Sequence, residues 1–257
     1  MLSQHVLQVA GVSKRFGGLQ ALNDVHLNIE RGQVYGLIGP NGAGKTTFFN
    51  VITGLYPADS GNFVLADQPY QPKDVHLVAQ AGFARTFQNI RLFADMTALE
   101  NVMVARHVRT HSGLLGAIFR TKSFTQEEKE IAERAHELLA YVGIDTLADV
   151  KARTLSYGDQ RRLEIARALA TDPQLLALDE PAAGMNATEK VQLRALIDKI
   201  RHDQRTVLLI EHDVKLVMGL CDRVTVLDEG QVIAEGTPAH VQRDARVMQA
   251  YLGTAQV

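Results

Sequence analysis

The chain has 257 residues, 46% hydrophobic and 22% charged, which are ordinary values for a globular protein and allow one domain with a subdomain or two. Its formal net charge of −2 leaves non-specific nucleic-acid binding without electrostatic support, so we expect no nucleic-acid partner. The single cysteine, Cys221, excludes an internal disulfide and falls in a helical apolar series with Val214 and Val217, which predicts a buried thiol.

The beginning of the chain shows no basic segment followed by an apolar core, so we expect no secretion signal. The longest apolar runs, such as residues 175–178, are far too short to cross a bilayer. If the protein works at a membrane, we expect a partner to hold it there.

Residues 6–9 and 25–29 alternate in polarity and are typical of half-exposed strands. Between them we expect a connection containing Phe16. A lone aromatic in such a place packs against its neighbours, or it offers a platform for a nucleotide base, a contact worth about 1–3 kcal/mol. Both interpretations stay open on this residue alone.

The most specific stretch of the sequence is a glycine loop that follows an apolar run at residues 34–38, which predicts a buried strand. After the loop, residues 46–53 can form a helix that ends before Gly54. The loop itself consists of Gly39, Pro40, Asn41, Gly42, Ala43, Gly44, Lys45, Thr46 and Thr47.

These residue types predict a phosphate-binding loop. Glycines let successive backbone N–H groups turn inward around an anion, and the following helix adds its unpaired N–H groups. Lys45 can reach the β- and γ-phosphates of a nucleotide, and the Thr46 hydroxyl can bind Mg²⁺.

Beyond a predicted strand at residues 62–66, Gln88 is the next candidate site residue. Its side chain can offer a carbonyl oxygen to Mg²⁺ and an amide to water. An ordinary surface glutamine is the alternative.

Residues 97–170 read mostly as helix. An apolar stripe from Ile131 to Val142 indicates a helix that Gly143 can stop. Inside this region, residues 113–124 are apolar and form either a loop folded back on the helices or a contact patch for a membrane partner.

Ser156 with Asp159 fits the capping box at the start of a helix, and residues 161–170 continue that helix. By itself this is a capped helix. Its N-terminus, with Ser156 and Gly158, could equally face a phosphate supplied from outside.

Asp179 and Glu180 end a second apolar strand, at a position where parallel sheets bind ligands. Asp179 can hold Mg²⁺, and Glu180 can polarise an attacking water. Solvated acids at a strand end are the alternative.

A loop with Gly184 follows, and a helix starts at Asn186 or Thr188. The next buried strand, residues 206–210, leads to His212, which can donate a hydrogen bond to a terminal phosphate or simply cap a helix. A hairpin over residues 223–235 and an amphipathic helix over 241–252 complete the prediction.

Taken in order, these pieces resemble the nucleotide-binding subunit of ATP-binding-cassette (ABC) transporters over essentially the whole chain. The resemblance implies a base-stacking Phe16, a Walker A loop at 39–47, the Q-loop at Gln88, the signature motif at 155–160, Walker B at 175–180, the D-loop at 183–186 and the switch histidine at His212.

The implied fold is α/β: a P-loop NTPase cassette with a RecA-like core, an antiparallel β subdomain and an inserted helical subdomain. We expect one ABC ATPase domain spanning residues 1–257. Its nucleotide-binding core and β subdomain would comprise residues 1–87 and 171–257, and the helical subdomain about 88–170.

Two motifs depart from the family pattern. Tyr157 and Asp159 replace a glycine and a glutamine of the usual signature, and Asn186 replaces the aspartate that usually ends the D-loop. Ser156 and Gly158, which would touch phosphate, remain. We therefore expect a competent ATPase.

Four stretches resemble most closely the ATP-binding subunits of high-affinity branched-chain amino acid importers, namely residues 85–88, 91–93, 156–167 and 249–253. Related subunits serve urea, amide and lipopolysaccharide export systems. The resemblance implies ATP and Mg²⁺, a second ATPase subunit, transmembrane permease subunits and, indirectly, a substrate-binding protein. It also implies a place at the cytoplasmic face of the inner membrane.

In this scheme Glu180 is the general base or water-orienting residue, and His212 contacts the γ-phosphate. A soluble ATPase switch is an alternative, but such relatives usually carry two cassettes or a long coiled-coil insertion. A small-molecule P-loop kinase would not explain the Ser156 helix or the Glu180 and His212 pair.

Overall fold

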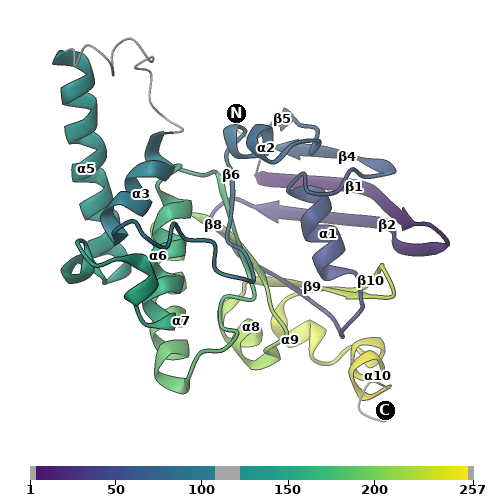
Figure 1. Ribbon diagram of the computed structural model, residues 1–257. Helices are drawn as coiled ribbons and strands as arrows, with labels where there is room; N and C mark the ends of the chain where they lie inside the picture. Colours follow the sequence, from purple (N-terminus) through teal and green to yellow (C-terminus); the bar gives the residue numbers. More distant parts are fainter. Residues whose placement is uncertain (1–3, 108–121, 254–257) are drawn as a thin grey trace. The chain divides into compact units, whose positions relative to one another are not determined.

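The computed structural model describes residues 4–107 and 122–253 (Figure 1). The chain divides into two compact units. The first combines Met1–Arg85 with Gln174–Val257, and the second is Thr86–Pro173.

Within the described residues, the first unit contains two sheets. The antiparallel one has the order β2-β1-β4-β5 and comprises β1 (His5–Phe16), β2 (Leu19–Glu30), β4 (Ser60–Leu65) and β5 (Gln68–Pro69). The other has the order β10-β9-β3-β8-β7-β6 and comprises β3 (Val34–Ile38), β6 (Phe83–Arg85), β7 (Leu175–Asp179), β8 (Thr206–Ile210), β9 (Arg223–Asp228) and β10 (Gln231–Gly236).

Strands β3, β7 and β8 pair in parallel and are buried along their full length. Such strands are continuous apolar runs because helices cover both faces of a parallel sheet. The hairpin of β9 and β10 turns at Glu229 and Gly230, whose φ values of 46° and 75° suit a tight hairpin turn. The helices of this unit are α1 (Lys45–Ile52), α2 (Val75–Gln80), α7 (Ala187–His202), α8 (Val214–Leu220), α9 (Pro238–Val241) and α10 (Ala245–Gly253).

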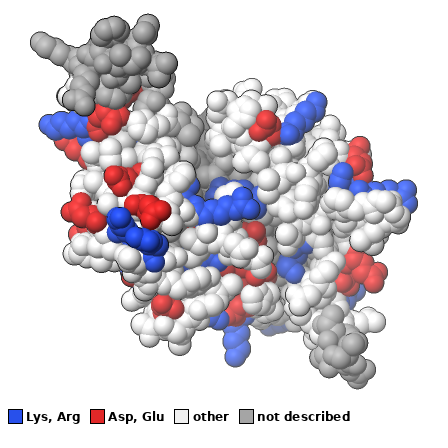
Figure 2. Space-filling model, in the orientation of Figure 1, with Lys and Arg blue, Asp and Glu red and all other residues white. Residues whose placement is uncertain are grey.

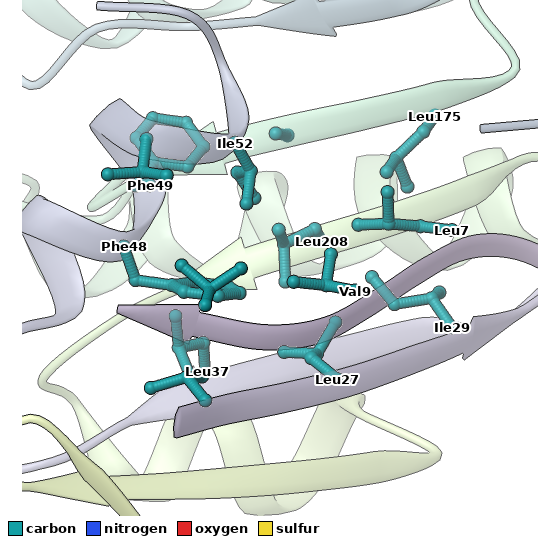
Figure 3. Packing of buried hydrophobic residues seen from close by; sticks show 14 of the residues in the cluster. Leu7, Val9, Leu27, Ile29, Leu37, Phe48, Phe49, Ile52, Leu175 and Leu208 are labelled. Atoms are coloured by element: carbon teal, nitrogen blue, oxygen red, sulfur yellow. The ribbon is translucent and has the colours of Figure 1, made fainter. Parts of the chain in front are cut away.

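The core of the first unit fills the space between the two sheets. In Figure 3 the side chains of Leu7 and Val9 from β1 and of Leu27 from β2 approach those of Phe48 on α1 and Leu208 on β8. The alternation expected for the first two strands is confirmed, since the inward residues of this set are buried. The phosphate-loop helix is thus anchored in the core by its own side chains.

The second unit is helical, as predicted. Its helices α3 (Ala98–Arg106), α5 (Lys122–Val142) and α6 (Tyr157–Leu169) pack against one another. The short 3-10 helices η2 (Asp145–Leu147) and η3 (Ala152–Thr154) connect α5 to α6. The expected apolar stripe on α5 is buried, and Gly143, with φ 77°, follows its last residue. Residues 113–121 of the apolar segment lie outside the described residues.

Two predicted boundaries were wrong. The β1 strand continues to Phe16, so the connection to β2 is only Gly17 and Gly18. The closing helix is two helices, because the Asp244 carboxylate accepts a hydrogen bond from the Arg246 N–H at 2.8 Å and starts α10 afresh.

Cys221 is buried at the end of α8, as predicted, and burial raises the pKa of its thiol. On the face drawn in Figure 2, acidic and basic side chains are interspersed, in keeping with the small net charge. Among the described helices, each is too short or too polar to cross a bilayer.

Helix α7 offers a matched test of the core. Ile197 is fully buried on it, whereas Val191 is 68% exposed. We expect Ile197→Ala to lower the free energy of unfolding by about 2–5 kcal/mol, because it removes buried methyl groups and leaves a cavity. Val191→Ala should change it by less than about 0.5 kcal/mol. Urea denaturation of both variants checks this, and equal losses would contradict the placement of this helix face.

Candidate active site

The glycine loop connects β3 to α1 and adopts backbone conformations that favour glycine. Gly39, Gly42 and Gly44 have φ values of 154°, 81° and 99°. A Cβ atom on Gly39 would lie 2.1 Å from the Leu227 carbonyl oxygen on β9, so the backbones approach too closely for a side chain. The loop is therefore clamped between its own helix and strand β9.

Lys45, the first residue of α1, folds back over the loop. Its ammonium Nζ donates hydrogen bonds to the carbonyl oxygens of Gly39, at 2.7 Å, and Pro40, at 2.9 Å. Burial lowers the pKa of this ammonium, and the negative charge of Glu180 opposes that shift. The cation is thus held inside the loop, where an entering phosphate could exchange with the carbonyl oxygens.

A cavity of about 680 Å³ opens beside the loop, a size suited to a small-molecule ligand. Phe16 lies on its wall, 43% exposed, with its ring edge-on to Tyr56 at 5.4 Å between centroids. The lining residues are Phe16, Leu19, Gln20, Ala21, Asn41, Gly42, Ala43, Gly44, Lys45, Thr46, Thr47, Glu180, Glu229 and Gly230. The structure therefore brings Phe16, most of the predicted loop and Glu180 to one site.

Asp179 is 6% exposed at the end of β7. Its Oδ2 lies 3.8 Å from Nη2 of Arg85, whose Nη1 donates to Thr53 Oγ1 at 2.5 Å and to Asn50 Oδ1 at 3.3 Å on the α1 side. The Arg85 guanidinium also lies 4.2 Å from the centroid of the Phe49 ring. This arginine connects the Asp179 carboxylate to the phosphate-loop helix.

Glu180 follows Asp179 with φ 46°, an uncommon conformation for a residue other than glycine, and its N–H donates to the Ile210 carbonyl at 2.8 Å. Its Oε2 lies 3.5 Å from Nδ1 of His212, which is 56% exposed. The two predicted strand-end residues are therefore neighbours.

Glu211 was not predicted as a site residue, although it lies between β8 and His212. It is fully buried and accepts hydrogen bonds from the N–H groups of Ala182, at 2.9 Å, His212, at 3.2 Å, and Asp213, at 3.4 Å. Burial raises the pKa of this carboxyl group, and those bonds oppose the shift. Glu211 supports the loops that carry Glu180 and His212.

Gly184, with φ 75°, and Asn186 lie in the loop before α7. The Asn186 side chain accepts from the Glu189 N–H at 3.0 Å, while Glu189 Oε2 accepts from the Asn186 N–H at 2.9 Å. Asn186 thus starts the helix through a complete capping box.

Gln88 and the signature residues belong to the second unit. Gln88 is exposed, and its carbonyl accepts a hydrogen bond from Nη2 of Arg161 on α6. The buried pair of Arg161 and Glu164 was missed in the sequence, where an arginine and a glutamate three residues apart look like an ordinary exposed helix pair.

Ser156 caps α6 as predicted, since its Oγ accepts from the Asp159 N–H at 3.2 Å. The reciprocal half of the capping box is wrong. The Asp159 carboxylate instead accepts from the Ser156 hydroxyl, at 2.6 Å, on one oxygen and from Arg162 on the other, so both oxygens are bonded to side chains. Gly158 is buried beside these residues.

The oxygen atoms of Thr46 and Asp179 are the donor type that Mg²⁺ prefers. Within residues 4–107 and 122–253, no three His, Cys, Asp or Glu side chains cluster as a metal site.

Comparisons with known proteins agree with this geometry. Residues 22–183 match the family model described as ABC transporter, and residues 231–257 match the one described as branched-chain amino acid ATP-binding cassette transporter. The chain belongs to the ABC transporter family. It is therefore an ATPase, and the predicted resemblance and fold class are confirmed.

Two relatives show the range of the similarity. The high-affinity branched-chain amino acid transport ATP-binding protein BraF of Pseudomonas aeruginosa is 47% identical over 255 residues, covering 99% of this chain and 100% of BraF. The lipopolysaccharide export system ATP-binding protein LptB of Escherichia coli is 32% identical, covering 96% and 97%.

Solved structures are also similar. A crystal structure of the ADP conformation of an ATP-binding cassette superimposes with a TM-score of 0.84, at 32% identity, and covers 98% of this chain and all of that one. A dimeric cassette in a post-hydrolysis state, bound to ADP and phosphate, gives a TM-score of 0.74 at 26% identity and covers 90% and 98%.

The glycine loop supplies a matched pair of substitutions. A Cβ atom added to Gly42 would have no other atom within 4 Å, whereas one added to Gly39 would meet the Leu227 carbonyl. We expect Gly42→Ala to cost about 1–2 kcal/mol of stability, from its left-handed backbone alone. Gly39→Ala should cost clearly more, because the backbone of β9 must move. Thermal unfolding of the two variants checks the order, and a milder effect of Gly39→Ala would contradict the clamp.

The Asn186 cap can be tested without disturbing the core. We expect Asn186→Ala to lower stability by about 1 kcal/mol, because the Glu189 N–H loses its acceptor. Asn186→Asp keeps that acceptor and should stay near the original stability. Chemical denaturation compares them, and a full loss in Asn186→Asp would show that the amide is needed for another reason.

Proposed function

We propose that this chain is the ATP-binding and ATP-hydrolysing subunit that powers an importer of the branched-chain amino acids leucine, isoleucine and valine. The observation that supports it most is the cavity that brings together Phe16, the glycine loop with Lys45, and Glu180. The full-length similarity to BraF supports the substrate class.

ATP would occupy this cavity with its base against Phe16 and its phosphates in the loop. The inward N–H groups of the loop and the N-terminus of α1 then bind the phosphate oxygens. Lys45 would leave the carbonyl oxygens of Gly39 and Pro40 for the β- and γ-phosphates. Its side chain is already buried in the loop, so the exchange replaces two neutral acceptors with charged ones at little further cost in hydration.

Glu180 would act as general base or orient the attacking water, since its carboxylate lines the cavity. His212, 3.5 Å from that carboxylate, would donate a hydrogen bond to the γ-phosphate. Mg²⁺ would be held by Thr46 and Asp179 and would neutralise developing charge on the phosphates. Arg85 and Glu211 would keep the acidic residues and their loops in place.

The signature helix would serve the ATP of a second ATPase subunit. Ser156 is exposed at the N-terminus of α6, where backbone N–H groups favour an anion. The similarity to a dimeric cassette supports this arrangement. Asn186 and Gly184 of the D-loop would then lie at the dimer contact, and we expect the second subunit to be a different chain.

The remaining partners follow from the same proposal. Transmembrane permease subunits would hold the chain at the cytoplasmic face of the inner membrane and respond to Gln88, and a substrate-binding protein would act through them. Urea or amide import and lipopolysaccharide export are alternative uses of such a subunit. The identity of 47% to BraF against 32% to LptB favours branched-chain amino acids.

The role of Glu180 can be tested directly. We expect Glu180→Gln to lower ATP hydrolysis by about 10²–10⁴-fold, because the amide cannot accept a proton from water. ATP binding should persist, since the loop is unchanged. The measurements are phosphate release and nucleotide affinity in the assembled transporter, together with uptake of labelled leucine by native cells at matched expression.

Glu133→Gln is a suitable control, because that side chain is 63% exposed on α5. Unchanged hydrolysis in Glu180→Gln would refute the proposed catalytic role. Lost hydrolysis with undiminished leucine uptake would keep the ATPase but redirect the substrate to urea, amides or lipid.

A further inference from the structure

The second unit contains a buried ion pair that the proposed reaction does not use. Arg161 and Glu164 on α6 are 2% and 5% exposed, and their Nη1 and Oε2 atoms lie 3.0 Å apart. Charged side chains are seldom fully buried unless they are paired and hydrogen-bonded. Either the pair stabilises the fold enough to offset the cost of desolvating two charges, or it fixes the position of a neighbouring segment without adding stability.

The pair is bonded to the backbone of the segment that carries Gln88. The Phe87 N–H donates to Glu164 Oε1 at 3.0 Å, and the Phe87 carbonyl accepts from Arg161 Nη1 at 2.6 Å. Arg161 Nη2 donates to the Gln88 carbonyl. The two side chains of α6 thus bind three backbone groups of two consecutive residues. The segment that contains these residues has no regular secondary structure.

The other end of this link reaches the exposed start of α6. The Tyr157 hydroxyl accepts a hydrogen bond from Arg161 Nη2 at 3.0 Å, and the guanidinium lies 5.4 Å from the centroid of its ring. Tyr157 is 41% exposed and stands where a glycine is usual in the signature. The departure from the family pattern therefore supplies a side chain that contacts Arg161.

A second arginine of α6 extends the attachment along the same segment. Arg167 donates to the Arg91 carbonyl, and its guanidinium lies 5.1 Å from the centroid of the Phe93 ring. The segment 87–93 is thus bonded to α6 at both ends.

We propose that Arg161 and Glu164 are positioning residues that tie the backbone at Gln88 to the signature helix, with Tyr157 as the exposed end of the link. The position of α6 then sets the position of Gln88. This inference rests on the proposed roles of Gln88 and the signature helix. When a phosphate binds at the start of α6, these hydrogen bonds change the position of Gln88, and no change of fold is needed.

The test uses a fluorescent reporter beside Gln88. The chain contains no tryptophan, so Asn89→Trp at an exposed position places one indole next to the link. Because the signature helix takes its phosphate from the second ATPase subunit, the reporter is measured in the assembled transporter that carries Asn89→Trp together with Glu180→Gln. The same assembly without Asn89→Trp supplies the background. ATP and Mg²⁺ should change the fluorescence anisotropy of the added indole. Adding Arg161→Met with Glu164→Leu keeps the buried volume and removes both charges, a replacement that often leaves stability unchanged.

We expect this double change to remove most of the ATP-induced anisotropy change, because the hydrogen bonds between α6 and the backbone at Gln88 are lost. ATP affinity should stay within about twofold, because the loop that binds the phosphates is not altered. In the assembled transporter, ATP turnover stimulated by substrate should fall, while turnover without substrate changes less. A folded double variant with the parental anisotropy response would overturn the proposal.

Lys129→Gln with Glu133→Gln is the matched control, because this pair lies 3.6 Å apart on α5 but is 69% and 63% exposed. It should leave the anisotropy response unchanged. If the buried double variant unfolds at a lower temperature than the parent protein, the single variants Tyr157→Phe and Arg161→Lys serve as the test instead. Each removes part of the link with little change in volume, and a parental response in both would overturn the proposal.

A charge swap separates the link from a simple ion pair. Arg161→Glu with Glu164→Arg keeps both charges but offers acceptors to the Phe87 and Gln88 carbonyls, which need donors. We expect no recovery of the anisotropy response, and full recovery would contradict the assigned hydrogen bonds. Because the anisotropy measurements use ATP without a transported substrate, absent leucine uptake would refute the proposed substrate without affecting them.

Discussion

The contact between the glycine loop and strand β9 constrains everything else at the nucleotide site. At Gly39 the loop backbone comes so close to the Leu227 carbonyl that no side chain fits. That approach fixes where the loop carbonyls point, and they in turn hold the Lys45 ammonium. The site is therefore preorganised by backbone packing around a buried lysine.

Much of this architecture could be predicted because its signals are local. Fully apolar runs predicted β3, β7 and β8, and the stripe on α5 with Gly143 after it predicted a helix and its end. The glycine loop carries its chemistry in consecutive residues. The boundaries that failed, at Phe16 and at Asp244, depend on strand pairing and on a single side-chain cap, which periodicity does not detect.

The residues that sequence reasoning missed share a different property. Arg85, Glu211 and the pair of Arg161 and Glu164 are charged, yet Arg85 is half-buried and the others are buried. Each acts on a partner distant in sequence or on a loop backbone. Nothing in the local sequence separates such a residue from an exposed one, because burial is decided by the packing of other elements. A charged residue directly at the end of an apolar strand was the available signal for Glu211 and Arg85.

Three of these charged residues, Arg85, Arg161 and Glu164, lie in or bond to one short segment, residues 85–88. Arg85, at its start, bonds to the phosphate-loop helix and to Asp179 within the first unit. Phe87 and Gln88, two and three residues later, bond to the signature helix within the second. Within three positions the chain therefore passes from a residue bonded to the phosphate-loop helix to residues bonded to the signature helix, and Gln88 stands at the second of these attachments.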